Sequence, residues 1–434
     1  MSRTVPFTVL EEAVYNIEQT FTPWNIQLEL ETSEPISIDR LESAVRTACA
    51  IHPLARAQKC PASTLDTDYV WEIPDVPDAG SITERTDSSS VSAARSEFYA
   101  ESFDLEEEPP FRVLVLRGKG IDDGDRLCLS VSHTPADGVA TLRLLRTICR
   151  AYRGEKPAAE GIPLAESRQL VEEIRPSGLS DRVQLLGAAT SHLGKLLDRP
   201  SRLASDSTTG QSGWGFVHRQ LDETLFESVV ENRPADTSIN DMLLTAVHLA
   251  VDIWNSDHGD PAGKISLLMP VNLRPEEWFY DVFGMYALFE SIVTRPTHRD
   301  DPQSAVEAVR SQTTTIKQEQ RAAALLESLN LVPNVTPVGI KRRSPELLRG
   351  PGESLVDTVM LSNLGRVPEL SGIGEAEPTL WFSPPSWQPT PVSIGVVTAG
   401  GTMQIVFRHM YTALDDAAAI EFADCFERQL RRLV

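Results

Sequence analysis

A histidine, an aspartate and a glycine lie close together in the segment His133-Thr-Pro-Ala-Asp137-Gly138. The histidine follows a stretch, 126–132, whose apolar residues alternate as in a strand with one buried face, and strand ends beside loops often carry functional sites. Histidine can accept a proton near neutral pH, and glycine lets a backbone approach a reacting group closely. The pattern therefore indicates a general base. An alternative stays open at this point, in which His133 is a core residue and Asp137 and Gly138 form a turn and helix N-cap.

Several other catalytic and ligand-binding patterns are absent from the sequence. It contains no G-x-x-x-x-G-K-S/T phosphate loop, no strand-borne G-x-G-x-x-G and no H-E-x-x-H pair. The segment Gly210-Gln-Ser212-Gly213 is followed by Trp214, so it fails the G-x-S-x-G pattern of a nucleophile elbow. Five scattered cysteines without a C-x-x-C pair indicate a reducing compartment and no cysteine zinc site. We therefore expect neither a metal nor a bound cofactor.

The charge balance excludes one large class of partner. The 434 residues include 62 acidic and 40 basic side chains, which gives a formal net charge of −22. A surface this negative repels phosphate backbones, so we expect no nucleic-acid binding. Seven of the basic residues are Lys, which leaves 33 Arg. Such a carboxylate-rich surface suits high ionic strength, where charges are screened. Two interpretations of this composition stay open: a halophilic protein, or an ordinary acidic protein from a GC-rich genome.

Neither a leader peptide nor a membrane-spanning segment is evident in the sequence. Residues 1–12 lack a long apolar core, and nowhere do about 18 uncharged apolar residues follow one another. We therefore expect a cytoplasmic protein without a membrane span.

Strand and helix patterns alternate along the chain and divide it into two parts of similar style. In the first part we expect helices that start after Ser37 and at 139, and strands at 26–31, 111–117 and 126–132. In the second part we expect helices at 238–254, 301–329 and 413–434, and strands near 215–221, 265–271, 287–294, 356–362, 392–398 and 403–408. Adjacent hairpins and interleaved helices indicate a mixed α/β (α+β) fold. The expected halves are 1–175 and 176–434, with a connector at about 153–212.

The His133 segment resembles the H-x-x-x-D-G motif of a large acyltransferase superfamily. That superfamily includes chloramphenicol acetyltransferase, the plant BAHD acyltransferases and the condensation domains of nonribosomal peptide synthetases. Three further segments resemble motifs of this CoA-dependent superfamily, in the expected order: Ile51-His-Pro-Leu-Ala-Arg56, Pro270-Val-Asn-Leu-Arg-Pro275 with Gly284, and Ser362-Asn-Leu-Gly365. The last is similar to a strand end of condensation-like, polyketide-associated and alcohol acetyltransferase members. Together the motifs cover nearly the whole chain.

The sequence also departs from some branches of this superfamily. Condensation domains usually carry two adjacent histidines, whereas Ser132 precedes His133 here, which suits ester-forming members. The DFGWG segment of the plant branch is absent, and no carrier or adenylation domain accompanies the motif. The chain therefore resembles a free-standing acyltransferase.

The resemblance implies a fold and a role for each motif residue. The fold is a pseudo-dimer of two chloramphenicol-acetyltransferase-like halves, each a mixed sheet with flanking helices, around a central tunnel. His133 would remove a proton from the acceptor. Asp137 would hold the loop through an ion pair with Arg274, and Gly138 would allow a close approach at the reacting centre.

Three more residues are candidates for substrate binding. By resemblance, Ser362 and Asn363 can hydrogen-bond the donor or the developing oxyanion, although a satisfied turn at a strand end describes them equally well. Trp387, with the aromatic stretch that begins at Trp381, is a candidate lining of an acceptor pocket. Ordinary core packing is the alternative for this stretch.

The resemblance implies transfer of an acyl group from a thioester, either acyl-CoA or a phosphopantetheinyl thioester on a carrier, to an acceptor. The ester-forming features favour an alcohol acceptor, and the thioester is a co-substrate rather than a bound cofactor. An amide-forming condensation enzyme and a catalytically silent condensation-like binding domain are the alternatives. We expect a monomer that meets small-molecule donors and acceptors, with an acyl carrier protein as partner if the donor is carrier-bound.

Overall fold

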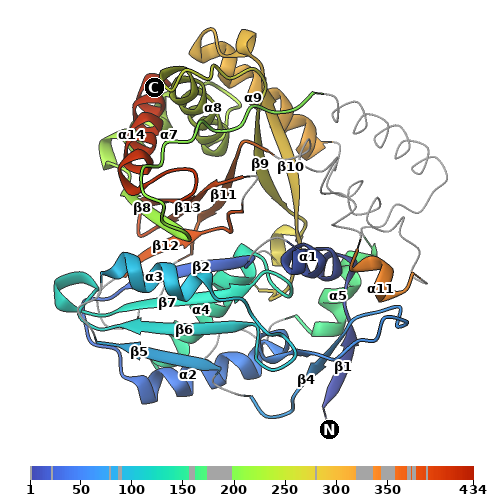
Figure 1. Ribbon diagram of the computed structural model, residues 1–434. Helices are drawn as coiled ribbons and strands as arrows, with labels where there is room; N and C mark the ends of the chain where they lie inside the picture. Colours follow the sequence, from blue (N-terminus) through green and yellow to red (C-terminus); the bar gives the residue numbers. More distant parts are fainter. Residues whose placement is uncertain are drawn as a thin grey trace.

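The computed structural model describes residues 2–20, 23–77, 80–86, 90–155, 162–173, 198–278, 281–318, 336–343, 357–368, 373, 378–387 and 390–434. Within these ranges the chain forms a three-stranded, a five-stranded and a six-stranded sheet. The two larger sheets, with their helices, belong to two halves that lie one above the other in Figure 1.

The first half contains the five-stranded sheet, in the order β12-β2-β7-β6-β5. Its strands are β2 (Asn25–Glu31), β5 (Ser81–Arg85), β6 (Phe111–Leu116), β7 (Arg126–Ser132) and β12 (Thr379–Ser383). All neighbours pair antiparallel except β5 and β6, which are parallel. Because β12 comes from the C-terminal part of the chain, that part contributes the edge strand beside β2.

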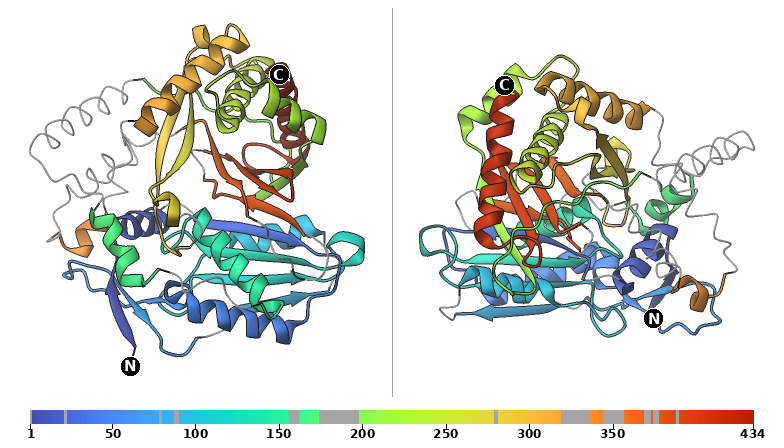
Figure 2. Two further views of the ribbon diagram at one scale, coloured as in Figure 1. Left: turned by 180° about the vertical axis from the view of Figure 1, so that it is seen from behind. Right: turned by 45° about the horizontal axis from the view of Figure 1, so that its top comes forward.

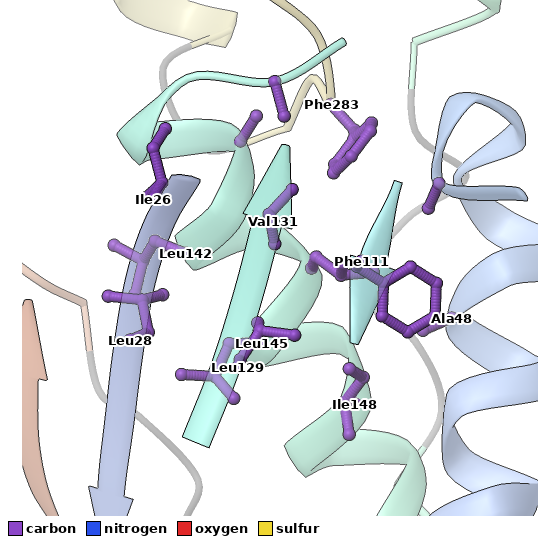
Figure 3. Close-up of a cluster of buried hydrophobic side chains, with 14 of the residues drawn as sticks. Ile26, Leu28, Ala48, Phe111, Leu129, Val131, Leu142, Leu145, Ile148 and Phe283 are labelled. Atoms are coloured by element: carbon purple, nitrogen blue, oxygen red, sulfur yellow. The ribbon is translucent and has the colours of Figure 1, made fainter. Parts of the chain in front are cut away.

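The apolar core of this half lies between the sheet and two helices, α2 (Ile38–Ile51) and α4 (Gly138–Tyr152). Figure 3 shows alternate residues of β2 (Ile26, Leu28) and β7 (Leu129, Val131) on the same side as the apolar residues of α4 (Leu142, Leu145, Ile148). Ser37 caps α2, and Asp137 caps α4. Burial of this apolar face holds α4 against the sheet, and with it the segment that links β7 to α4.

The second half contains the six-stranded sheet, in the order β10-β9-β11-β13-β14-β8. Its strands are β8 (Trp214–Gln220), β9 (Ile265–Asn272), β10 (Ala287–Thr294), β11 (Val359–Arg366), β13 (Val392–Ala399) and β14 (Thr402–Met410). Only β11 pairs parallel with its neighbours in the described part of this sheet. The helices of this half are α7 (Glu223–Asn232), α8 (Ile239–Asp257), α9 (Pro302–Gln318) and α14 (Asp416–Arg432). Their apolar faces and one face of the sheet form the second core.

Smaller elements complete the first half and join it to the second. A three-stranded sheet consists of β1 (Arg3–Pro6), β4 (Val70–Ile73) and β3 (Gln58–Lys59), in that order. Among the residues that the structure describes, the remaining α-helices are α1 (Val9–Thr20), α3 (Val91–Ala100), α5 (Leu164–Glu173) and α11 (Val338–Lys341). Leu10 and Val14 of α1 cluster with Tyr286 and Leu288, and Figure 2 shows α1 beside the ends of β9 and β10. Tyr15 of α1 belongs to the apolar core of the first half, so helix α1 packs on both halves.

The mixed α/β fold expected from the sequence, built as two sheet-and-helix halves, is confirmed. The strand expected at 26–31 and the helix expected from 139 are observed as β2 and α4. The helix expected at 301–329 is observed as α9 up to Gln318, and its remainder lies outside the described residues. Residues 156–161 and 174–197 of the expected connector also lie outside the described residues. The division between 175 and 176 stays a prediction.

Candidate active site

His133 lies directly after β7, where the chain leaves the sheet. Its backbone N–H donates to the carbonyl of Trp24, 3.0 Å away, which continues the pairing of β7 with β2. The residue is 4% exposed. The ring of Trp24 lies 6.5 Å away and that of Phe289, on β10, lies 6.3 Å away, measured between ring centroids. Residues from both halves therefore enclose the imidazole.

Burial of the His133 ring favours its uncharged form. Loss of hydration lowers the pKa of His133 below its usual 6.5, although the surrounding backbone and the charge of Asp137 oppose the shift. Nδ1 is buried and has no hydrogen-bond partner among the residues that the structure describes. The imidazole is therefore neutral near pH 7, which is the form that accepts a proton.

The carboxylate of Asp137 binds three groups that fix the loop after His133. Arg274 pairs with both oxygens, Nη1 with Oδ2 at 2.6 Å and Nη2 with Oδ1 at 2.9 Å. The N–H of Ala140 donates to Oδ1 at 3.0 Å, which caps α4, and the N–H of Tyr286 donates to Oδ2 at 2.8 Å. The aspartate and arginine side chains are 3% and 0% exposed. Paired, bidentate hydrogen bonds of this kind fix geometry, so Asp137 positions the loop.

Arg274 itself is held by residues of the second half. Its Nη1 donates to Oδ1 of Asn272 at 3.0 Å, and its Nη2 donates to the carbonyl of Gly284 at 2.8 Å. The guanidinium lies 4.6 Å from the centre of the Tyr286 ring, within cation–π range. The structure thus brings the predicted partners Asp137 and Arg274 together, and the end of β9 and the start of β10 hold the loop that carries His133.

Gly138 begins α4 at a crowded position. A Cβ atom at this residue would lie 2.9 Å from Cδ2 of Leu364 and 3.4 Å from the ring of Phe382. Leu364 belongs to β11 and Phe382 to β12, so the glycine lets two strands from the C-terminal part of the chain pack against the start of the helix. Packing alone is a sufficient reason for glycine here.

Two of the predicted substrate-binding residues lie on β11, close to this contact. Ser362 is 7% exposed and precedes Leu364 by two residues. The amide of Asn363 is engaged locally, since Oδ1 accepts from the N–H of Gly365 at 2.8 Å and Nδ2 donates to Asn240 Oδ1 at 3.3 Å. The turn interpretation therefore describes Asn363, and a role for either residue toward a thioester stays a prediction.

The aromatic stretch that begins at Trp381 separates into two environments. Trp387 stacks on Trp24, with ring centroids 4.6 Å apart and an interplanar angle of 28°. Because Trp24 contacts His133, Trp387 lies one ring away from the imidazole. Trp381 instead belongs to β12, where its Nε1 donates to Glu31 Oε1 at 2.8 Å. Strand packing describes Trp381, whereas Trp387 stays a candidate wall of the acceptor pocket.

Sequence reasoning missed Trp24, Phe289 and Glu18 as neighbours of His133. The first two lie beside or inside strands that periodicity predicts, but no local pattern shows that these strands meet at the histidine. Glu18 lies on α1, which the sequence analysis did not predict. The segment 51–56, which resembles a family motif, packs into the apolar core of the first half. There His52 hydrogen-bonds Thr147 of α4 at 2.9 Å.

Glu18 binds the residues on either side of the histidine. Its Oε2 accepts hydrogen bonds from the hydroxyls of Ser132, at 3.1 Å, and Thr134, at 2.9 Å. Burial raises the pKa of Glu18 to about 7, although both hydroxyls act in the opposite direction. Ser132, the residue before His133, therefore supports the loop through Glu18.

Comparison with known proteins shows close relatives of this chain. No protein-family model matches it. Two curated proteins, Uncharacterized protein MT2362 and Uncharacterized protein Rv2305, come from two strains of Mycobacterium tuberculosis. Each is 34% identical over 416 residues, which covers 94% of this chain and 94% of the relative. The chain belongs to the family of these two proteins. Because both members are uncharacterized, this membership assigns no reaction.

Solved structures share the fold of this family at lower sequence identity. The first condensation domain of the calcium-dependent antibiotic synthetase has a TM-score of 0.71 at 14% identity, over 99% of this chain and 97% of that chain. Trichothecene 15-O-acetyltransferase from Fusarium sporotrichioides has a TM-score of 0.70 at 11% identity, over 100% of this chain and 96% of that chain. The epimerization domain from the third module of tyrocidine synthetase B has a TM-score of 0.66 at 15% identity, over 100% of this chain and 96% of that chain. The fold expected from the motifs is therefore confirmed. Because these names state three different reactions, the reaction has to be argued from the site.

Two further features concern the described part of the chain alone. None of its helices is long and apolar enough to cross a membrane. It also contains no group of three or more His, Cys, Asp or Glu side chains placed to hold a metal ion.

Proposed function

We propose that the protein is an acyltransferase that moves an acyl group from a thioester, either acyl-CoA or a carrier-bound phosphopantetheine thioester, to an alcohol. The observation that carries this proposal is a neutral, buried imidazole with an unpartnered ring nitrogen, enclosed by residues of both halves. The second support is the fold, which this chain shares with an O-acetyltransferase and with condensation domains.

In the proposed reaction His133 takes the proton of the acceptor hydroxyl while the hydroxyl oxygen attacks the thioester carbonyl. The C–S bond then breaks as the carbonyl re-forms, and the departing sulfur receives the proton. General-base catalysis of this kind contributes about 10²- to 10⁴-fold to the rate, and holding both substrates together contributes the rest. Ser362 is the residue that we propose to hydrogen-bond the donor, or the oxygen on which negative charge develops.

Asp137 is a positioning residue in this proposal. Its carboxylate is neutralised by Arg274 and accepts two backbone N–H groups, and no hydrogen bond joins it to the His133 ring within the described ranges. The rings of Trp24 and Phe289 form apolar walls beside the imidazole. Such walls exclude water, which would otherwise compete with the alcohol for the thioester.

The proposal is tested by incubating the protein with a panel of acyl-CoA and carrier-bound thioesters, each with and without an alcohol or an amine. We expect release of free thiol that depends on the alcohol, with an ester as product in mass spectrometry. An amide product would contradict the choice of acceptor. Thiol release that no acceptor increases, for every donor tested, would contradict the acyl-transfer proposal itself.

A further inference from the structure

Arg408 of β14 carries a charge that is buried inside the protein. The residue is 0% exposed, and no carboxylate pairs with it in the part of the chain that the structure describes. Its Nη1 lies near two carbonyl oxygens, those of Asn25 at 3.5 Å and Pro384 at 3.4 Å. Its Nε and Nη2 have no hydrogen-bond partner there. An unpaired buried ion is strongly destabilising, so this side chain calls for a partner of opposite charge.

Other buried polar groups without described partners lie on β2 and β7, on the strand faces that continue from the Asn25 contact with Arg408. On β2, residues 25 and 27 point away from the apolar core that Ile26 and Leu28 enter, so Asn25 Oδ1 and the whole amide of Gln27 face the second half. Ser130 pairs opposite Gln27, and its hydroxyl is likewise unpartnered among the residues described.

The chain that follows β12 adds a further group of the same kind. The hydroxyl of Ser386 is buried without a described partner, and the carbonyl of Ser386 accepts from Trp214 Nε1 at 3.3 Å. The Trp214 ring lies 5.0 Å from the Arg408 guanidinium, which places Ser386 in the same region.

The free groups of this cluster are mostly hydrogen-bond donors. Arg408 offers three N–H bonds, one on Nε and two on Nη2, the Gln27 amide offers two, and the hydroxyls of Ser130 and Ser386 can each donate one. A ligand that satisfies them must present oxygen acceptors and a negative charge. A carboxylate does both, and arginine binds carboxylates through paired hydrogen bonds.

Neighbouring charges do not supply the missing anion. Glu29 is the next residue of β2 on this face, but it is already paired with Arg95 at 2.6 Å and Arg126 at 2.8 Å. Against the effect of burial, these two cations hold the pKa of Glu29 at about 2. His218 is neutral, because burial lowers its pKa to about 3. Burial lowers the pKa of Arg408 to about 9, so its guanidinium remains charged at neutral pH.

The cluster adjoins the candidate active site. Asn25, whose carbonyl lies near Arg408, pairs with Ser132 and follows Trp24. The carbonyl of Trp24 accepts from the N–H of His133 at 3.0 Å. The guanidinium therefore contacts the strand segment that holds the proposed base.

We propose that Arg408, together with Gln27, Ser130 and Ser386, forms a subsite for a carboxylate group of one of the two substrates. The substrate class is then a hydroxy acid as acceptor, or a thioester whose acyl chain ends in a second carboxylate. As a statement about substrates, this inference rests on the proposed acyl transfer. As a statement about carboxylate binding, it stands on the buried cluster alone.

The test compares wild type with Arg408→Met, which removes the charge but keeps the length of the side chain. Arg219→Met is the matched control, because Arg219 lies on the neighbouring strand β8 and is paired with Asp424 at 2.9 Å. Two pairs of compounds isolate the carboxylate: succinyl-CoA against butyryl-CoA as donors, and lactate against isopropanol as acceptors. A preference within the first pair assigns the subsite to the donor, and a preference within the second assigns it to the acceptor.

We expect wild type and Arg219→Met to favour the charged member of at least one pair by about tenfold to 100-fold in kcat/KM. Arg408→Met should lose that preference and handle the uncharged member normally. Its midpoint of urea unfolding should equal or exceed that of wild type, because the substitution removes an unpaired buried charge. A lower midpoint with unchanged preferences would overturn the subsite and leave Arg408 a structural role.

A binding measurement separates this inference from the proposed function. At constant ionic strength, lactate should raise the melting temperature of wild type but not that of Arg408→Met, and isopropanol should raise neither. If no variant transfers acyl groups but this difference in melting is present, the carboxylate subsite stands and the acyl-transfer proposal fails. If acyl transfer occurs but no preference and no difference in melting are seen, water satisfies these groups and the subsite is overturned.

Discussion

Asp137 and Arg274 are 137 positions apart in the chain, yet they form a buried bidentate ion pair with N–O distances of 2.6 Å and 2.9 Å. Asp137 caps the first helix after the candidate base, and Arg274 follows β9 of the second half. The N–H of Asp137 also donates to the carbonyl of Gly284, at 3.3 Å. One buried pair thus sets the position of His133 relative to the opposite half of the molecule.

Removal of either partner of this pair should destabilise the fold. Asp137→Ala leaves Arg274 buried and unpaired, and we expect the free energy of unfolding to fall by about 3–5 kcal/mol in urea titrations. Asp137→Ala combined with Arg274→Met should lose less than the sum of the single losses. Glu42→Ala, which removes the exposed partner of Arg46, serves as the control and should change stability little. Full stability of Asp137→Ala with lost turnover would instead place Asp137 in the chemistry.

Two glycines beside Phe382 should respond differently to an added methyl group. In Gly138→Ala the new Cβ would lie 2.9 Å from Cδ2 of Leu364, a flexible side-chain end that can move. In Gly395→Ala it would meet the backbone carbonyl of Phe382, which cannot move without displacing β12. We therefore expect a loss of about 1 kcal/mol for Gly138→Ala and a clearly larger loss for Gly395→Ala in urea unfolding. The reverse order would show that the start of α4 is the more rigid of the two contacts.

The candidate site was predictable from the sequence where its residues share a short motif. His133, Asp137 and Gly138 lie within six positions, and resemblance supplied Arg274. The neighbours that enclose the ring were not predictable in this way, because Trp24 and Phe289 meet His133 only through the pairing and stacking of distant strands. Their strands could be predicted from alternation, but alternation does not state which strands become neighbours.

The fold shows the same limit at β12 and β14. In the sequence the aromatic run from Trp381 is a candidate pocket lining, with core packing as the alternative. Trp381 and Phe382 belong to β12, which pairs with β2 across the halves, whereas Trp387 lies beyond this strand and stays a candidate wall. Arg408 falls at the end of a predicted strand, where a charged residue normally faces water. It is buried because β2 and the segment after β12 cover that face of β14.

Buried histidines should make the fold sensitive to mild acid. Burial lowers the pKa of each of three histidines to about 3: His52, His218 and His248. Between that value and the usual 6.5 the unfolded chain binds protons that the folded chain does not, so stability falls as pH decreases through this window. Glu18 acts in the opposite sense between 4.5 and about 7, because burial raises its pKa in the folded state.

These four groups together give a net uptake of about two protons on unfolding near pH 5.5, or about 3 kcal/mol of stability per pH unit. Urea titrations across that range measure the slope directly. In His248→Asn, which keeps an acceptor for Thr294 Oγ1, the number of protons taken up on unfolding should fall by about one, and the slope should decrease accordingly. A slope near zero in wild type, or one that His248→Asn leaves unchanged, would contradict this account of the buried imidazoles.

The acidic composition predicts a dependence of stability on salt. With a net charge of −22, surface carboxylates repel one another in dilute buffer, and this repulsion is screened as the Debye length falls to about 3 Å at 1 M salt. For a halophilic protein we expect the melting temperature to rise steadily with KCl over this range. Equal melting temperatures in dilute buffer and in molar KCl would favour an ordinary acidic protein.

The role of His133 as the base is tested most directly by comparing the rate of thiol release by wild type and His133→Ala with the same donor and acceptor. His258→Ala is a suitable control, because His258 lies at the end of α8 and contacts Trp254, away from the proposed base. We predict that His133→Ala keeps the melting temperature of the folded protein but releases thiol about 10²- to 10⁴-fold more slowly, while His258→Ala matches wild type. Equal thiol release by wild type and a folded His133→Ala would contradict the assignment of His133 as the base.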